Sequence, residues 1–219
     1  MDYRTEYRIE VEQDCIPVRG NALASGDAEA DREAEDEILA RLDRGDVWAW
    51  AAVTVIAEQD GFEGHDSLGG CSYASEADFK RSDYYADMRN VARENMLAKV
   101  ATAVQDVNIY SRGAGFVGEG TGGGCMALVR YFGSIPDGPD VRDLGTITIT
   151  NGDAHIPLSL DAEAIVCVNR PGAWTHGIDD HGDPLVRVTT LREALAWGSE
   201  QTSHAEALAR VPASWTEAS

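Results

Sequence analysis

The sequence predicts an α+β fold built from two small sub-domains. Residues 1–106 are expected to form a β-α-β-β-α unit, because helical and period-2 hydrophobic patterns alternate there. Residues 107–219 are expected to form a glycine-rich, mainly β unit closed by a C-terminal helix, because short β-rich segments follow one another between turn residues. With 219 residues, 43% of them hydrophobic, the chain is long and apolar enough to bury a core.

The first unit is predicted to open with a strand and a helix. Residues 6–15, EYRIEVEQDC, alternate polar side chains with the apolar Tyr7, Ile9 and Val11, which is typical of a strand. A helix is expected over residues 28–43, with Ser25 or Asp27 as its N-cap and Gly45 at its end. Its apolar face would comprise Ala34, Ile38, Leu39 and Leu42.

A hairpin is predicted next. Residues 47–56 are apolar at both odd and even positions, which indicates either a central strand packed on both faces or a strand with a covered edge. Trp48 and Trp50 would then share one face, either in a core or as an aromatic pair that binds a partner. Residues 60–73, DGFEGHDSLGGCSY, indicate a turn and a return strand.

A long helix and a series of strands complete the predicted order. The helix is expected over residues 75–105, with a capping box from Ser75 and Asp78. Its apolar face would comprise Met88, Val91, Ala92, Met96, Val100 and Val104. Strands are expected over residues 106–110, 124–132, 145–150, 163–169 and 185–190, and a final helix over 190–211 that is broken or bent near Gly198.

The charge balance restricts the partners. The formal net charge is −20, from 38 acidic and 18 basic residues, which should repel nucleic acid and anionic membranes and attract basic proteins. We expect the carboxylates of the first helix and the residues after it to occupy lysine and arginine sites that normally hold phosphates; the alternative is a solvated helix face. The expected partner-binding residues are Glu29, Glu33, Glu35, Asp36, Glu37, Asp43 and Asp46.

The cysteines and the N-terminus indicate a reducing cytoplasm. Cys15, Cys71, Cys125 and Cys167 are widely spaced without a CxxC pair, so a zinc ribbon and a thioredoxin-type motif are excluded. We expect free, mostly buried thiols. The first residues lack the apolar core of a signal peptide, and no run approaches the ~18 apolar residues of a membrane helix.

One glycine motif is of the kind found in dinucleotide-binding sites. Residues 112–118, RGAGFVG, contain G-x-G-x-x-G, whose third glycine opens a helix in dinucleotide-binding folds. Here the following residues, EGTGGGCMALVRYF, favour a loop and a strand. We therefore expect a glycine loop between two strands and no nucleotide cofactor. Cys71 and Cys125 each follow glycines, and His65 precedes Cys71 by six residues, but the sequence pairs neither thiol with a base.

A second segment could carry metal chemistry. Residues 174–184, WTHGIDDHGDP, contain His176, Asp179, Asp180, His181 and Asp183, which are metal-ligand residue types without a common zinc spacing. The favoured interpretation is an acidic turn, with no metal and no catalytic residue. The alternative is a small enzyme or a metal- or ligand-binding protein that uses this segment with the 113–124 glycine loop.

Four blocks of the chain resemble uncharacterised accessory proteins carried by phages and plasmids. They are VRGNALASGD, DEILARLDRGDVWAWAAV, DSLGGCSY and GEGTGGGCMALV, which together hold 48 of the 219 residues. The resemblance implies a mobile-element protein. Such elements often encode acidic inhibitors of host defence, including anti-CRISPR and anti-restriction proteins. The leading hypothesis is therefore an acidic protein, without enzymatic activity, that inhibits a nucleic-acid-binding complex in a bacterial host cell.

Overall fold

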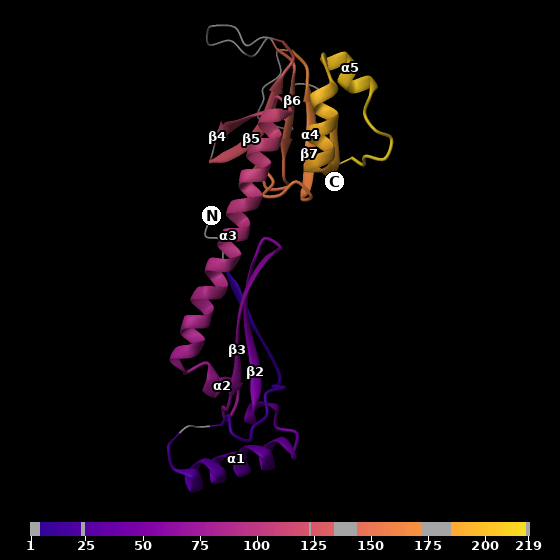
Figure 1. Ribbon diagram of the computed structural model, residues 1–219. Helices are drawn as coiled ribbons and strands as arrows, with labels where there is room; N and C mark the ends of the chain where they lie inside the picture. The colour runs from indigo at the N-terminus through magenta and orange to yellow at the C-terminus, as the bar shows by residue number, and fades with distance from the viewer. Residues whose placement is uncertain (1–4, 23–24, 123, 134–143, 172–184, 218–219) are drawn as a thin grey trace. The chain divides into compact units, whose positions relative to one another are not determined.

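The protein is an α+β chain in two compact units, Met1–Ala101 and Thr102–Ser219 (Figure 1). The computed structural model describes residues 5–22, 25–122, 124–133, 144–171 and 185–217. The sequence-predicted boundary at 106/107 lies five residues beyond Ala101. No helix in these described ranges is long and apolar enough to cross a membrane.

The first unit contains a three-stranded antiparallel sheet. Its strands are β1 (Glu6–Gln13), β2 (Ala51–Gln59) and β3 (Phe62–Cys71), in the order β1-β2-β3. The predicted central strand is confirmed, because β2 pairs with both neighbours and buries most of its side chains. Asp60 and Gly61 both have positive φ, as the tight turn between β2 and β3 requires.

The two tryptophans do not share a strand face as predicted. Val47–Ala49 form a short 3-10 helix, η1, because the Asp46 side chain accepts a hydrogen bond from the Trp48 N–H and starts a helical turn there. Trp48 packs towards the ring of Phe79, with 5.9 Å between ring centroids. Trp50 is buried in another cluster and donates from Nε1 to the Ile16 carbonyl over 2.8 Å. The tryptophan pair is therefore divided between two cores.

The predicted helix over 75–105 is two helices, α2 (Glu76–Phe79) and α3 (Asp83–Gly113). The Ser75 hydroxyl caps α2. At the start of α3, the Ser82 hydroxyl accepts a hydrogen bond from the Tyr85 N–H over 3.3 Å. The predicted strand over 106–110 is wrong, because these residues continue α3. Val107 and Ser111, one turn apart, are both buried, which favours the helical periodicity.

The second unit contains a five-stranded antiparallel sheet in the order β4-β5-β6-β7-β8. Each strand pairs with the next in the chain, so the sheet is a meander. The last four of these strands match the predicted ones. The strands are β4 (Val117–Gly122), β5 (Cys125–Tyr131), β6 (Thr146–Thr150), β7 (Glu163–Asn169) and β8 (Leu185–Thr190).

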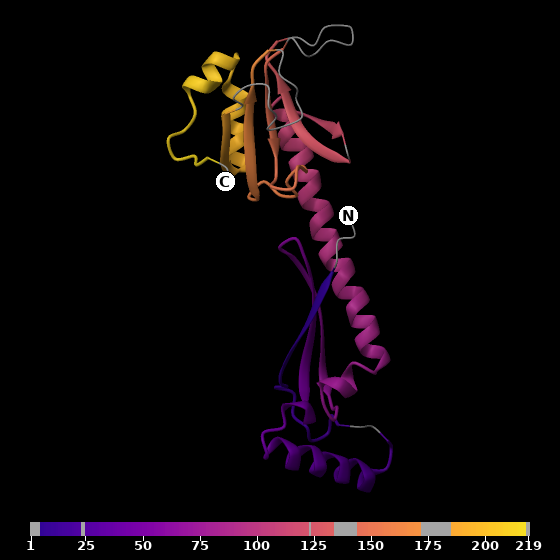
Figure 2. The same ribbon diagram turned by 180° about the vertical axis from the view of Figure 1, so that it is seen from behind.

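Helix α4 (Leu191–Glu200) lies along one face of this sheet (Figures 1 and 2). Leu191, Ala194 and Leu195 of this helix pack on Ile147 and Ile149 of β6. The predicted final helix is broken near Gly198, as expected: α4 runs through Gly198 to Glu200, and α5 (His204–Ala209) starts after a break. The absence of a side chain at Gly198 allows α4 to pack closely on Phe116, because a Cβ at this position would lie 2.7 Å from the Phe116 ring.

Candidate functional site

Helix α1 (Ala28–Leu42) carries most of the predicted partner-binding residues. Asp27 is its N-cap and accepts hydrogen bonds from the N–H groups of Glu29 and Ala30 over 2.9 and 3.2 Å. Acidic residues in the first turn and Arg41 in the last complement the helix dipole. The predicted apolar face anchors the helix: Ile38 is buried, and Leu39 and Leu42 pack against the same cluster.

Three of the predicted residues lie on the inner side of this region or make structural contacts. Glu35 is buried; it accepts from the Gly20 N–H and pairs with Arg19 over 3.2 Å. Asp36 is exposed and pairs with the same arginine. Asp46 caps η1 and pairs with Arg41 over 2.8 Å. These three carboxylates hold together the segments around α1, so their negative charge is at least partly compensated.

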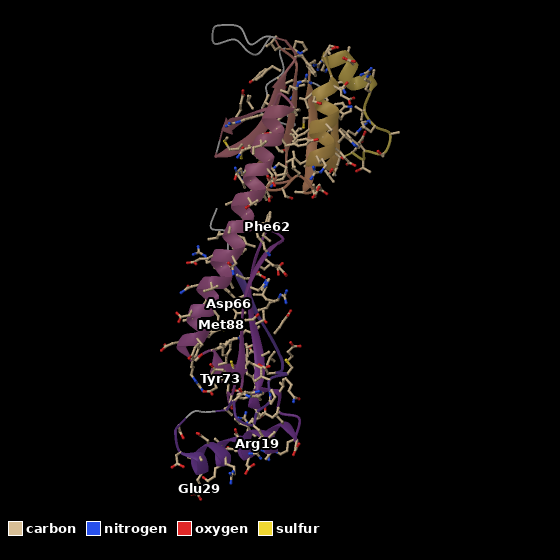
Figure 3. All side chains as sticks on the ribbon, viewed as in Figure 1. Arg19, Glu29, Phe62, Asp66, Tyr73 and Met88 are labelled. Carbon is tan, nitrogen blue, oxygen red and sulfur yellow. The ribbon has the colours of Figure 1, made fainter. Side chains whose placement is uncertain are left out.

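The other four predicted residues are exposed: Glu29, Glu33, Glu37 and Asp43. Among the residues that the structure describes, none of their carboxylates has an ion-pair or hydrogen-bond partner. Glu29, Glu33 and Glu37 follow one another at four-residue intervals, so they line one side of the helix about 6 Å apart along its axis. Figure 3 shows Glu29 at the outer side of α1, whereas Arg19 lies towards the rest of the unit. We call these four residues the acidic face of α1.

The electrostatic surroundings strengthen this face. Residues 1–101 hold 23 acidic and 11 basic residues, which is a net charge of −12. Arg19 and Arg41 are engaged by the inner carboxylates, which leaves Arg32 and Arg44 as the exposed basic residues within or directly after α1. The negative charge of α1 is therefore concentrated on its solvent side, where a cationic surface can reach it.

The glycine motif forms neither a dinucleotide site nor the expected loop. Gly113 ends α3, Gly115 takes a positive φ in the turn, and Gly118 lies inside strand β4. No helix N-terminus follows the third glycine, so the element that would hold a pyrophosphate is absent from this stretch. Gly124, also with positive φ, belongs to the turn between β4 and β5.

The sequence did not predict a cluster of buried polar side chains in the second unit. Asn169 of β7 donates from Nδ2 to the hydroxyls of Thr146 and Thr148, each over 3.0 Å, and all three are buried. They alternate with Ile147 and Ile149, so they lie on the sheet face opposite α4. On the neighbouring strand β5, Tyr131 lies opposite Thr146 and donates its hydroxyl to both oxygens of Glu119 over 2.6 and 2.7 Å. The alternating TITIT of β6 is the sequence signal that could have indicated a polar row.

The chemistry of this face does not favour nucleophilic catalysis. Burial, the hydrogen bond to Glu119 and its charge raise the pKa of Tyr131, so the hydroxyl stays a donor at neutral pH. Burial raises the pKa of Cys167 to about 11, so its thiol stays protonated as well. Tyr131 pairs with Glu119, and Asn169 pairs with Thr146 and Thr148, as is usual for buried polar groups with a structural role.

The remaining candidate residues are the histidines and aspartates of residues 174–184 and the four cysteines. His176, Asp179, Asp180, His181 and Asp183 lie outside the described residues. Cys71 and Cys167 are buried and Cys125 is half-buried, whereas Cys15, against expectation, is exposed. Within the described ranges, no group of three or more histidine, cysteine or acidic side chains is placed to hold a metal ion.

Comparison of the chain with models of protein families, with curated proteins and with solved structures finds no match.

Proposed function

We propose that this protein binds a basic surface of a nucleic-acid-binding protein complex through the acidic face of α1, and so inhibits that complex. The proposed setting is the bacterial cytoplasm, and the proposed target class is a host defence effector of the CRISPR or restriction type. The protein would be encoded by a phage or another mobile element. The observation that carries the proposal is the exposure of Glu29, Glu33, Glu37 and Asp43, whose carboxylates have no compensating partner among the residues that the structure describes.

The physical mechanism is competition for cations. Lysine and arginine side chains that bind phosphates would meet a row of carboxylates about 6 Å apart along a rigid helix. Because α1 is capped and anchored by its apolar face, the row is pre-organised and little entropy is lost on binding. Long-range attraction from the net charge of −20 would make association fast and salt-sensitive.

The test replaces three carboxylates by amides of the same shape. The variant Glu29→Gln, Glu33→Gln, Glu37→Gln changes the net charge from −20 to −17. Exposed ion pairs contribute about 0.2–1 kcal/mol each, so the triple variant should bind roughly 3- to 150-fold more weakly. The matched control, Glu12→Gln, Glu58→Gln, Glu94→Gln, changes the same charge at exposed positions away from α1.

The assay measures release of fluorescent DNA from purified CRISPR and restriction effector complexes, at about 50 and 300 mM salt. We expect release by the natural chain and by the control variant, loss of release by the α1 variant, and weaker release at high salt. If the two triple variants release DNA equally well, the acidic face of α1 does not contribute to inhibition. Failure to release DNA from any complex of the panel would refute inhibition of these classes.

A further inference from the structure

Strand β4 is an edge of the five-stranded sheet. In the described part of the chain it pairs only with β5, with Val117 opposite Val129 and Glu119 opposite Ala127. Its sequence, VGEGTG, places glycines at alternate positions. An edge strand carries a row of backbone N–H and C=O groups to which another strand can bind.

The register shows which backbone groups point outwards. The Met126 N–H donates to Ala154 and the Phe132 N–H to Gly145, so even-numbered residues of β5 turn their backbone groups away from β4. Ala127 and Val129 therefore bond to Glu119 and Val117. By the same alternation, the N–H and C=O groups of Gly118 and Gly120 point away from the sheet.

These outward groups are accessible. Gly118 and Gly120 are exposed, and their backbone groups have no hydrogen-bond partner in the part of the chain that the structure describes. No side chain at either position shields them. Val117, at the start of the strand, exposes 45% of its surface, so an apolar contact lies beside the free backbone groups.

Other sheet edges of the described chain are covered or charged. The outer carbonyls of β3 accept from α3: Asn95 Nδ2 donates to His65 over 3.0 Å, and Lys99 Nζ donates to Glu63 over 2.7 Å. Beside β8, the Val188 N–H donates to Thr216 over 2.9 Å. The β1 edge carries four exposed charged side chains, which discourage pairing: Glu6, Arg8, Glu10 and Glu12. Within the described residues, the outward backbone groups of Gly118 and Gly120 have neither kind of protection.

We infer that β4 binds an extended, basic segment of a partner polypeptide, which adds to the sheet as a sixth strand. The charge of the strand selects the partner. Glu119 accepts a hydrogen bond from Tyr131 and has no ion-pair partner among the described residues, and residues 102–219 hold 15 acidic and 7 basic residues, a net charge of −8. A lysine or arginine opposite Glu119 would supply the missing counter-charge, and an apolar residue two positions away would reach Val117.

A second copy of this chain fits the edge less well. Antiparallel pairing of two β4 strands that bonds Gly118 to Gly120 would place the two Glu119 residues directly opposite each other. Like charges in that position are destabilising, and both chains carry a net charge of −20. The electrostatics therefore favour a basic partner over self-association.

The experiment uses the full chain and two capped peptides, TKTVTKTV and its acidic counterpart TETVTETV, with amide hydrogen exchange followed by NMR. In the free protein, the Gly118 and Gly120 amides should exchange fast and the Val117 and Glu119 amides slowly. The basic peptide should slow exchange at both glycines at least 10-fold, and the acidic peptide should not. No added protection, equal protection by both peptides, or protection that rises with protein concentration alone would overturn the inference.

Variants separate the backbone contact from general attraction to an acidic protein. Gly118→Pro with Gly120→Pro removes two outward N–H donors, and neither glycine has a positive φ that would exclude proline. Peptide affinity should fall at least 10-fold, whereas Gly118→Ala with Gly120→Ala should retain it. If the proline variant does not fold, the exchange data on the natural chain decide. The α1 variant Glu29→Gln, Glu33→Gln, Glu37→Gln should bind the peptide normally, so this inference and the proposed function can fail separately.

Discussion

Replacing Gly64 by alanine should strongly destabilise the first unit. Gly64 lies in β3, and a Cβ there would be 2.1 Å from the carbonyl oxygen of Ala92 and 2.2 Å from the backbone nitrogen of Met96. Both atoms belong to the backbone of α3, so no side-chain rotation can relieve the clash. The absence of a side chain at this one position allows the helix to lie directly on the strand.

The magnitude follows from the movement that a methyl group would impose. The contact with Ala92 must open from 2.1 Å to at least 3.0 Å, which lifts α3 from β3 by about 0.9 Å. Overpacking of this kind costs about 1–3 kcal/mol. The same movement weakens the hydrogen bonds from Asn95 and Lys99 to the carbonyls of β3, at about 1 kcal/mol each. We therefore expect a loss of about 3 kcal/mol, or roughly 12–24 °C in the Tm of a unit of this size.

Thermal melts followed by circular dichroism measure the loss, and hydrogen exchange of peptides from β2 and β3 assigns it to the first unit. The control is Gly113→Ala in the last turn of the same helix, where a Cβ meets nothing within 4 Å and φ is not positive. This control should melt at the natural temperature or slightly above. A Gly64→Ala protein that melts within about 3 °C of the natural one would refute the close packing of α3 on β3.

Three further predictions concern single side chains. Glu35→Ala should lower stability by about 1–3 kcal/mol in urea unfolding, because it removes the buried acceptor of the Gly20 N–H, whereas the exposed Arg19 keeps its pair with Asp36. Backbone N–H donors lower the pKa of Asp14, so its contribution to stability is present above the unfolded pKa of about 3.9 and is lost as the pH falls further; Asp14→Asn should therefore flatten the stability profile between pH 5 and 2. Cys15 should react at once with a thiol reagent at pH 8, whereas Cys167 should react only after unfolding.

Much of the fold could be predicted because its signals are local. The alternation in residues 6–13 and the periodicity of Ile38 and Leu42 in α1 reflect one buried face each, and the structure has both elements. The errors arise where a single hydrogen bond or a tertiary contact decides. The Asp46 cap turns part of an apolar run into η1, and burial of Val107 keeps a β-prone segment helical.

The candidate site was predictable only in part. Sequence spacing places Glu29, Glu33 and Glu37 in a row, and the structure has this row on the exposed side of α1. Spacing does not reveal that Glu35 turns inwards, because its partner Arg19 comes from a loop sixteen residues earlier. The open edge of β4 also depends on strand order, which no local pattern specifies.

If the row of exposed glutamates on α1 serves binding, it should lower the free energy of unfolding of the protein. Each Glu–Glu pair at four-residue spacing costs about 0.2–0.5 kcal/mol, and the described contacts show no structural return for Glu33 and Glu37. Glu33→Gln with Glu37→Gln removes both repulsive pairs and keeps Glu29 near the positive end of the helix dipole, so it should raise the free energy of unfolding by about 0.4–1 kcal/mol. The gain should vanish in 1 M salt, where charges are screened within about 3 Å. A variant that is less stable than the natural chain by 1 kcal/mol or more would show that these carboxylates serve the fold, and the argument for a binding surface would lose its basis.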